Sequence, residues 1–412
     1  MEYALGNVFG LDTFLLRCWL WSRYSRFTGS VMSSIVSGSR LPHIKGSIFA
    51  DLSRAAKKRG AVNLSQGFPD FAPDQRLLDA LKETVSGNYH QYGLPEGSEM
   101  LRQSVARMFR NLYHVEPAPD TEVTVTAGAT QAISAAVSSL IHAREEVIFF
   151  SPAFESYAPA VMLAGAVPVC VNLRPPTFDV DWEEVEDRVT PRTRMIIVNS
   201  PHNPSGRCWT ADDVKRLAEI AEKYNLLVLS DEVYHNIVFE REHITAISDE
   251  RLKQRSVVVG SLGKTMHVTG WRIGYAIAAA PLTNEIRKIL QFNTYAAPTP
   301  LQQAMAVVLD DAAYRGLPDL FLRKRNRFIE GLRNSRFGFT PTGGGYFQLV
   351  DYSAISELSD TEFSAHLMET HGVAALPVSG FGPQYAQARL LRFCFAKKEK
   401  TLDAATTILR NI

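Results

Sequence analysis

Apolar and polar positions form two patterns that repeat along most of the chain. Apolar residues recur at helical spacing in LLDALKETV, EMLRQSVARMFRNLY, ATQAISAAVSSLIH and ADDVKRLAEIAEKY. Short apolar runs lie between and after them, in EVTVTAG, EEVIFFS, AVPVCVN, RMIIVNS, LLVLSD, SVVVGS and GWRIGYAIAAA. Because the short runs do not alternate with polar residues, we expect strands covered on both faces. This order of helices and strands predicts an α/β fold with a mostly parallel central sheet.

The pattern changes after about residue 310. A charged helix around DLFLRKRNRFIEGL is followed by the glycine cluster TGGGYFQLVD, the strands GVAALPV and RLLRFCFA and a last helix. We therefore predict a large domain over residues 77–310 and a smaller α/β domain over residues 311–412. Residues 41–76 have little core of their own and are expected to contribute to the small domain and to a substrate site. Residues 1–40 are predicted to be an extension that is disordered or dispensable.

The first 31 residues differ in composition from the rest of the chain. Their apolar patches are interrupted by Asp12, Arg17 and Arg23, so they are too short and too charged to span a bilayer. Arginines and hydroxyl residues in this segment fit an organellar presequence, whereas Glu2 and Asp12 argue against one. The expected location is the cytoplasm, with organellar targeting by residues 1–31 as the alternative.

Composition narrows the kind of ligand. The 412 residues are 46% hydrophobic and 21% charged with a formal net charge of +1, as in an ordinary globular protein. No run of like charge stands out, so neither nucleic acid nor a membrane is an expected partner and a small-molecule substrate is favoured. The four cysteines are scattered without ligand spacing, and we predict no metal site.

The stretch SLGKTMHVTGWRIG contains a lysine that resembles that of a phosphate loop. The phosphate-loop motif GxxxxGK[ST] requires a glycine five residues before Gly263, where this chain has Val258. The segment that follows, GWRIGYAIAAA, has the pattern of a strand instead of the helix that the motif needs. Lys264 is therefore not predicted to hold the phosphates of a nucleotide.

Unusual residues concentrate where the predicted strands end. These positions carry AGAT, SPAFESY, NSPHNPSG, SDEVY and SLGKT. In open α/β sheets, ligands bind outside the carboxyl ends of the strands. One ligand that combines an anionic group, a flat ring, a ring nitrogen that pairs with a carboxylate and an aldehyde that reacts with lysine is pyridoxal 5′-phosphate. We predict this cofactor.

From about Leu41 to the C-terminus, the chain resembles the fold-type-I, class I aminotransferases that depend on pyridoxal phosphate. Within that family it is similar to the methionine aminotransferases and the kynurenine aminotransferases, also called glutamine transaminases. The resemblance rests on ordered motifs: NLSQGFPDF, HQY, VTAGAT, SPAFESYAPA, NSPHNPSG, SDEVY, SLGKT with TGWRIG, and LRFCFAKKE. It implies a large domain with a mostly parallel sheet and a smaller α/β C-terminal domain.

The resemblance assigns the catalytic residues. It implies that Lys264 forms the covalent bond to the cofactor, that Asp231 pairs with the ring nitrogen, and that Tyr234 and Asn203 donate to the ring's phenolic oxygen. From the residues alone, an aspartate after a strand is also a turn or helix-cap residue. Asn-Pro-Ser-Gly is likewise a good turn without any ligand.

The resemblance also assigns the remaining cofactor contacts. Ala129 and Thr130 follow Gly128 at a strand-to-helix junction, where free N–H groups favour an anion. Ser261 and Arg272 match the family's hydroxyl and cationic phosphate ligands, and Phe154 matches the residue that stacks on the ring. An aromatic residue at such a position is also a common core residue.

Arg392 lies inside an otherwise apolar strand, where a guanidinium needs an anionic partner. A structural salt bridge would satisfy it. The resemblance instead assigns it to the substrate carboxylate, together with Gly67 and Asn203. Phe49 matches an aromatic position of the substrate pocket, so we expect an apolar or sulfur-containing side chain to bind.

Two tyrosines imply a homodimer with shared active sites. Tyr92, in the cofactor site, and Tyr295, in the substrate site, match positions that cross from the partner subunit in the family. Aspartate-type relatives place a second arginine near Tyr295, and the loop FNTYAAPT contains none.

The expected activity is transfer of the amino group of a methionine-, glutamine- or kynurenine-type L-amino acid to a 2-oxo acid, with ping-pong kinetics. Two alternatives stay open at this point. One is β-elimination from cysteine S-conjugates at the same site, and the other is a non-catalytic regulatory protein that keeps the fold. The complete set of matching site residues argues against the second.

Overall fold

A computed structural model describes residues 39–42, 44 and 46–412 of the chain. The chain divides into two units at residue 42, and the fold below is that of the second unit, residues 43–412. The predictions of a dispensable extension and of a targeting segment fall almost entirely on residues 1–38, outside the described part.

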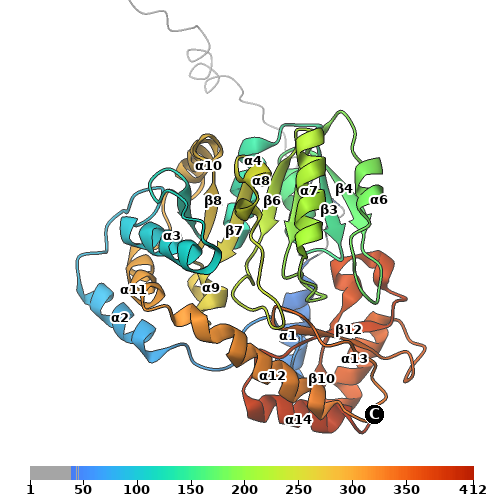
Figure 1. Ribbon diagram of the computed structural model, residues 1–412. Coiled ribbons are helices and arrows are strands. Elements are labelled where there is room, and N and C mark those ends of the chain that lie inside the picture. Colours follow the sequence, from blue (N-terminus) through green and yellow to red (C-terminus); the bar gives the residue numbers. More distant parts are fainter. Residues whose placement is uncertain (1–38, 43, 45) are drawn as a thin grey trace, which may run out of the picture. The chain divides into compact units, whose positions relative to one another are not determined.

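A seven-stranded sheet forms the centre of the fold (Figure 1). Its strand order is β2-β8-β7-β6-β5-β3-β4. The strands are β2 (Val123–Thr126), β3 (Glu146–Ser151), β4 (Val167–Asn172), β5 (Thr193–Asn199), β6 (Leu227–Asp231), β7 (Ser256–Ser261) and β8 (Gly274–Ala278). All neighbours pair in parallel except β8, which runs antiparallel to both β2 and β7. The predicted, mostly parallel sheet is confirmed.

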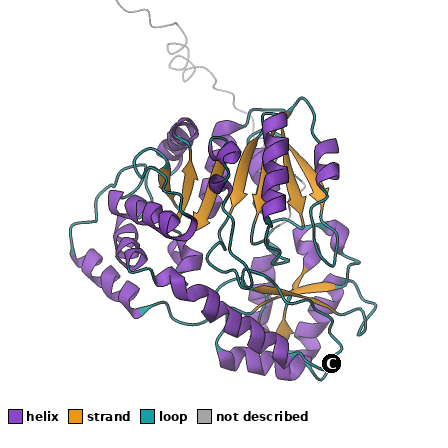
Figure 2. Cartoon of the chain, viewed as in Figure 1, coloured by secondary structure: helices purple, strands orange, loops and turns teal. Residues whose placement is uncertain are grey.

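Helices cover both faces of this sheet (Figure 2). One face packs against α4 (Ala129–Leu140), α5 (Tyr157–Leu163) and α10 (Ala280–Asn293). The other face packs against a larger apolar core that includes α3 (Glu99–Tyr113), α6 (Trp182–Asp187), α7 (Ala211–Lys223) and α8 (Glu250–Lys253). Since successive residues of a strand point to opposite faces, the unbroken Val/Ile/Leu runs supply both cores.

The edge strand β4 departs from the expectation that every strand is covered on both faces. It has only one neighbour, β3, and Val167 at its start is 44% exposed. An edge strand lacks a partner on one side, so its apolar sequence is only partly buried.

Local sequence explains where the helices begin. Thr210 caps α7 through a reciprocal pair of hydrogen bonds with Asp213, and Ser359 does the same with Glu362 at the start of α13 (Asp360–His371). The helix α9 (Leu262–Thr265) is a single turn that follows β7 directly. It ends before a 3-10 turn and strand β8, which is why its sequence has no extended helical periodicity.

Shorter strands form two further sheets. An antiparallel sheet has the order β11-β12-β9, from β11 (Leu376–Pro377), β12 (Leu390–Cys394) and β9 (Phe347–Asp351). A parallel pair joins β1 (Val62–Asn63) to β10 (Val373–Ala374). The segment GVAALPV therefore contains two short strands in place of the single predicted one. The predicted domain boundaries at residues 76 and 310 are not tested by this arrangement and stay a prediction.

The remaining helices complete the second unit: α1 (Ile48–Arg59), α2 (Gln75–Ser86), α11 (Thr299–Asp310), α12 (Leu317–Gly331) and α14 (Glu399–Leu409). Helix α11 packs on α2 and α3, and α12 packs on α14.

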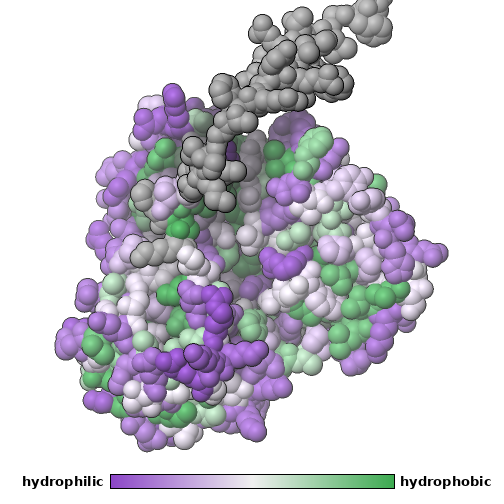
Figure 3. Space-filling model, turned by 180° about the vertical axis from the view of Figure 1, so that it is seen from behind, coloured by the Kyte–Doolittle hydropathy of each residue, from purple (hydrophilic) through white to green (hydrophobic). Residues whose placement is uncertain are grey.

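Hydrophilic residues cover most of the face seen in Figure 3, and hydrophobic ones form small scattered groups. None of the helices described is both long and apolar enough to cross a membrane.

Candidate active site

The candidate site lies where the parallel strands end. Strands β6 and β7 are neighbours, and they end at Asp231 and Ser261. The single turn of α9 then places Lys264 three residues beyond Ser261. Because the strands are parallel, their last residues meet at one edge of the sheet, as the rule for ligand sites in α/β folds requires.

Lys264 is partly buried, and its amine has one hydrogen bond. Nζ donates to the main-chain carbonyl of Gly67 at 3.2 Å and lies 5.7 and 5.5 Å from the ring centres of Tyr234 and Tyr346. Burial lowers the pKa of Lys264 to about 8, and the positive charge of Arg392 acts in the same direction. About one tenth of this amine is therefore unprotonated at pH 7, which supplies the form that a nucleophile or base needs.

Asp231 is a buried carboxylate without a cation of the protein beside it. One oxygen accepts from the hydroxyl of Tyr157 at 2.5 Å, and the other accepts from the N–H of Val233 at 3.3 Å. Burial raises the pKa of Asp231 to about 6, opposed by the hydrogen bond from Tyr157. No lysine, arginine or histidine nitrogen among the described residues comes within 4.0 Å of it. A cationic ligand atom at this place would stabilise the ionised carboxylate.

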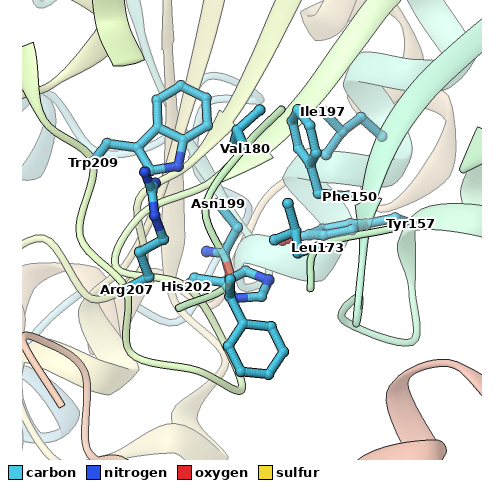
Figure 4. A pocket seen from close by; sticks show the side chains of 10 residues that line it. Phe150, Tyr157, Leu173, Val180, Ile197, Asn199, His202, Arg207 and Trp209 are labelled. Carbon is cyan, nitrogen blue, oxygen red and sulfur yellow. The ribbon is translucent and has the colours of Figure 1, made fainter. Parts of the chain in front are cut away.

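Tyr157, Asn199 and His202 are polar side chains near Asp231 that sequence analysis missed, and they help to line a small pocket (Figure 4). The amide of Asn199 donates to the main-chain carbonyl of Asp231, and its oxygen accepts the N–H of Asn203, each at 2.8 Å. Burial lowers the pKa of His202 to about 4, so its imidazole is neutral. The two hydrogen bonds of Asn199 hold the main chain in place at Asp231 and Asn203.

Tyr157 lies within the motif SPAFESY that drew attention to this strand end. It begins helix α5, and its buried ring also packs edge-on against Phe154 at 5.8 Å. The sequence pattern does not mark Tyr157 as a site residue among the other aromatic residues, because the carboxylate that its hydroxyl contacts, Asp231, is 74 residues away.

The opposite end of the site presents donors for an anion. Gly128 has φ of +83°, and a Cβ at this position would lie 2.6 Å from Nη2 of Arg272. A Cβ at Gly274 would lie 2.7 Å from the nitrogen of Ala129. The two glycines therefore let Arg272 and strand β8 approach the first turn of α4, where Ala129 and Thr130 offer N–H groups at a helix N-terminus.

Arg272 and Ser261 complete this donor group. The guanidinium of Arg272 is exposed and donates to the carbonyl of Thr269 at 3.2 Å, with no carboxylate of the described residues within 4.0 Å. Ser261 is buried at the end of β7. An arginine, a hydroxyl and the N-terminus of a helix together suit a phosphate.

Arg392 is almost completely buried, with 1% of its surface exposed. It donates to the side-chain oxygen of Asn203 and to the carbonyl of Ser65, both at 2.8 Å, while its Nε–H has no partner. No aspartate or glutamate of the described residues lies within 4.0 Å, so the structural salt bridge weighed above is not found there. A buried guanidinium without a counter-ion is costly, and an anionic ligand would remove that cost.

Three phenylalanine rings surround the guanidinium of Arg392. The ring centres of Phe347, Phe381 and Phe49 lie 3.8, 5.0 and 5.4 Å from it. Phe49, which the resemblance assigned to the substrate pocket, lies beside Arg392, whereas Phe347 and Phe381 were not predicted. Their only signal in the sequence is an aromatic residue in an apolar segment, which is also typical of a core.

Tyr92 and Tyr295 are placed differently from the other predicted residues. Their rings pack edge-on at 5.5 Å, and they are 90% and 41% exposed. Among the residues that the structure describes, no side-chain hydrogen bond or ring contact joins either tyrosine to Lys264. The structure places the other predicted residues at or just beyond strand ends, at the first turn of α4, or around Lys264 and Arg392: Phe49, Gly67, Ala129, Thr130, Phe154, Asn203, Asp231, Tyr234, Ser261, Lys264, Arg272 and Arg392.

The donor set fits pyridoxal phosphate. The buried acid at 231 suits a protonated ring nitrogen, the amine at 264 suits an aldehyde, and the group around Arg272 suits a phosphate. When bound, this cofactor supplies a ring that accepts the electrons released as the α-proton of an amino acid leaves.

Comparison with known proteins agrees with this chemistry. Residues 59–409 match the family model described as aminotransferase class I and II. A methionine aminotransferase of Escherichia coli (strain K12) is 42% identical over 381 residues, which cover 92% of this chain and 99% of that protein. Kynurenine–oxoglutarate transaminase 3 of Mus musculus is 30% identical, covering 91% of this chain and 90% of the relative.

Solved structures are similar as well. A crystal structure from Escherichia coli, described as having a methionine aminotransferase function, superimposes with a TM-score of 0.90 at 42% identity, covering 92% of this chain and 100% of that one. N-succinyldiaminopimelate aminotransferase from Mycobacterium tuberculosis gives a TM-score of 0.88 at 38% identity, covering 91% and 100%.

The chain belongs to the class I and II aminotransferase family. It has the fold-type-I architecture and is a pyridoxal phosphate-dependent aminotransferase. The relatives named here are aminotransferases, so neither β-elimination nor a non-catalytic role is favoured.

Replacing Tyr157 by Phe tests the electrostatics of the site. Loss of the hydroxyl removes a donor that stabilises the ionised Asp231, so the pKa of this carboxyl rises further above its ordinary value. Since the ionised form is needed, the acidic limb of the kcat–pH profile should move up by about 0.5 to 1 pH unit. Tyr113→Phe is the control, because that hydroxyl contacts His235 and not Asp231. An unchanged acidic limb in Tyr157→Phe would contradict the assignment.

Proposed function

We propose that the enzyme transfers the amino group of an apolar, sulfur-containing or aromatic L-amino acid, of the methionine, glutamine or kynurenine type, to a 2-oxo acid. The observation that carries this proposal is the buried Arg392, a guanidinium with no carboxylate of its own, enclosed by phenylalanine rings. Its charge suits the α-carboxylate that all amino acids share, and the rings suit an apolar side chain beside it. Two of the relatives are named for methionine and for kynurenine, which supports the proposal.

In this proposal Arg392 and Asn203 orient the amino acid. The side-chain oxygen of Asn203 accepts from Arg392, which leaves the Asn203 amide free to donate toward the ring's phenolic oxygen. The orphaned Nε–H of Arg392 adds a donor for the substrate carboxylate. Tyr234, buried between Lys264 and Phe347, donates to the phenolic oxygen as well.

Lys264 moves the proton. Its lowered pKa, about 8, would allow the amine to take the proton from the α-carbon of the amino acid and then to give that proton back. One residue thus acts first as base and then as acid. Asp231 would pair with the ring nitrogen of the cofactor, Ala129, Thr130, Ser261 and Arg272 would hold its phosphate, and Phe154 would contact its ring.

Replacing Lys264 by Ala tests its covalent role. The variant should lose the absorbance band of the covalently bound cofactor and at least about 10³-fold of kcat, since nucleophile and base are removed together. Lys398→Ala, which changes an exposed lysine, is the control and should retain both properties. Transamination at the normal rate by Lys264→Ala would reject the assignment.

Replacing Arg392 by Leu tests recognition of the carboxylate. Loss of a buried, charged hydrogen-bond donor should lower kcat/KM for an amino acid by about 100-fold or more. The parent enzyme should discriminate strongly against the matching amine without the carboxylate, and the variant should not. Arg389→Leu, which removes an arginine paired with the exposed Glu357, is the matched control. Equal loss for the amino acid and the amine would argue against this role of Arg392.

A panel of amino donors tests the pocket. Methionine, glutamine, kynurenine, phenylalanine and aspartate are each mixed with the enzyme, and conversion of the cofactor to its amine form is followed by absorbance. The aromatic surroundings of Arg392 and the absence of an arginine in FNTYAAPT predict that aspartate is the poorest donor, by about 10-fold or more. Aspartate as the best donor would contradict the pocket argument.

We further propose a homodimer in which Tyr92 and Tyr295 enter the partner's site. Phe292, Tyr295, Tyr92 and Leu94 are exposed apolar residues, and Phe292 is 86% exposed. An apolar surface of this kind favours contact with another protein surface, and a second copy of this chain is its proposed partner.

Phe292→Asp should convert the dimer to monomer and lower kcat by about 10-fold or more, because a charge would be buried in the interface and the shared sites lost. Light scattering after size exclusion gives the mass. Leu163→Asp, on an exposed apolar residue of α5, should leave the dimer intact. A parent enzyme that is monomeric and fully active would contradict the proposal.

We also propose that the protein is located in the cytoplasm. Imaging of the full chain in cells tests this location, and import into an organelle would contradict it.

A further inference from the structure

Lys397 is a buried lysine that has no part in the proposed reaction. It comes from the motif LRFCFAKKE, just beyond strand β12, and only 2% of its surface is exposed. Among the described residues no carboxylate lies within 4.0 Å of its amine. Burial of a lysine is rare unless its charge is satisfied, so its partners are informative.

The partners of Lys397 are two carbonyls that flank Gly67. Its Nζ donates to the carbonyl of Phe68 at 2.7 Å and to that of Gln66 at 3.3 Å, and it lies 4.7 Å from the centre of the Phe68 ring. The carbonyl of Gly67, between them, accepts instead from Lys264 at 3.2 Å and from the hydroxyl of Tyr346 at 2.7 Å. Lys397 thus binds the two carbonyls that flank Gly67, and Lys264 binds the carbonyl of Gly67 between them.

Neighbouring contacts show how closely this segment is held. The carbonyl of Ser65 accepts from Arg392 at 2.8 Å, so three cationic side chains bind four consecutive carbonyls. A Cβ at Gly67 would lie 2.8 Å from the ring of Phe347, which itself packs on Arg392. Rotation of the peptide groups of residues 65–68 would therefore disturb the side chains around Lys264.

We propose that Lys397 is a positioning residue, which holds Gln66 and Phe68 so that the carbonyl of Gly67 faces the amine of Lys264. The inference rests on the proposed role of Lys264. Lys397 acts through the main chain of residues 66–68, and it touches neither the substrate nor the cofactor in this account. Without it, two carbonyls lose a charged donor, and the peptide groups on either side of Gly67 are free to reorient.

The main test compares purified holoenzymes of the parent, Lys397→Met and the control Lys398→Met. Methionine keeps much of the apolar length of lysine and removes the donor. Lys398 is the exposed neighbour, whose recorded contact is made by its main chain. Three properties are measured: the midpoint of the pH titration of the cofactor absorbance, kcat/KM for the best donor of the panel, and the melting temperature.

Lys397→Met should bind the cofactor but show kcat/KM lower by about 10- to 100-fold. The carbonyl of Gly67 accepts a hydrogen bond from the nitrogen of Lys264 and so stabilises the protonated form of that nitrogen. If the carbonyl is misaligned, the midpoint of the absorbance titration should move to lower pH by about 0.5 unit. Lys398→Met should match the parent. A Lys397→Met enzyme with a lower melting temperature but a normal midpoint and normal kcat/KM would overturn the proposal, because Lys397 would then be only structural.

Tyr346→Phe provides a second test that does not depend on the folding of Lys397→Met. It removes one hydroxyl, the other donor to the Gly67 carbonyl, and leaves the ring in place. The midpoint should move in the same direction and kcat/KM should fall by about three- to tenfold. A normal Tyr346→Phe enzyme would show that the orientation of this carbonyl is unimportant and would overturn the proposal. Failure of the Lys264 assignment is recognised separately, because Lys264→Ala would then keep its absorbance band.

Discussion

The structure keeps three ionisable side chains, Lys264, Asp231 and Arg392, inside the protein, and none of them has an opposite charge of the described residues within 4.0 Å. Burial favours the neutral form of each group. It lowers the pKa of Lys264 to about 8 and that of Arg392 to about 10, and it raises the pKa of Asp231 to about 6. Such an arrangement lowers the stability of the folded chain. It is understandable if ligands supply the missing partners: a charged ring nitrogen for Asp231, a reactive aldehyde for Lys264 and a carboxylate for Arg392.

The parallel sheet makes this arrangement possible. Strands β6 and β7 end side by side, and the short helix α9 returns Lys264 toward the end of β6. Arg392 reaches the same place from strand β12 of a different sheet, together with Gly67 from the segment after β1. The charged groups thus come from rigid elements far apart in sequence, and their distances are set by packing and not by flexible loops.

Sequence patterns predicted the strand ends well, because buried parallel strands are recognisable from unbroken apolar runs and their polar last residues stand out. Arg392 could be singled out because a charge in an apolar strand needs a partner. Tyr157 and Lys397 could not be assigned a role in this way. The first bonds a carboxylate far along the chain, and the second binds main-chain carbonyls, whose direction no side-chain pattern records. The edge position of β4 was missed for a similar reason, since strand order is a property of the folded sheet.

The most direct test of the central claim is to find which lysine carries the cofactor. The holoenzyme is treated with borohydride, digested, and its peptides are analysed by mass spectrometry. The account predicts that the added mass of the reduced cofactor lies on Lys264 and on no other lysine. Attachment at another site, such as the buried Lys397, or no attachment at all, would contradict it.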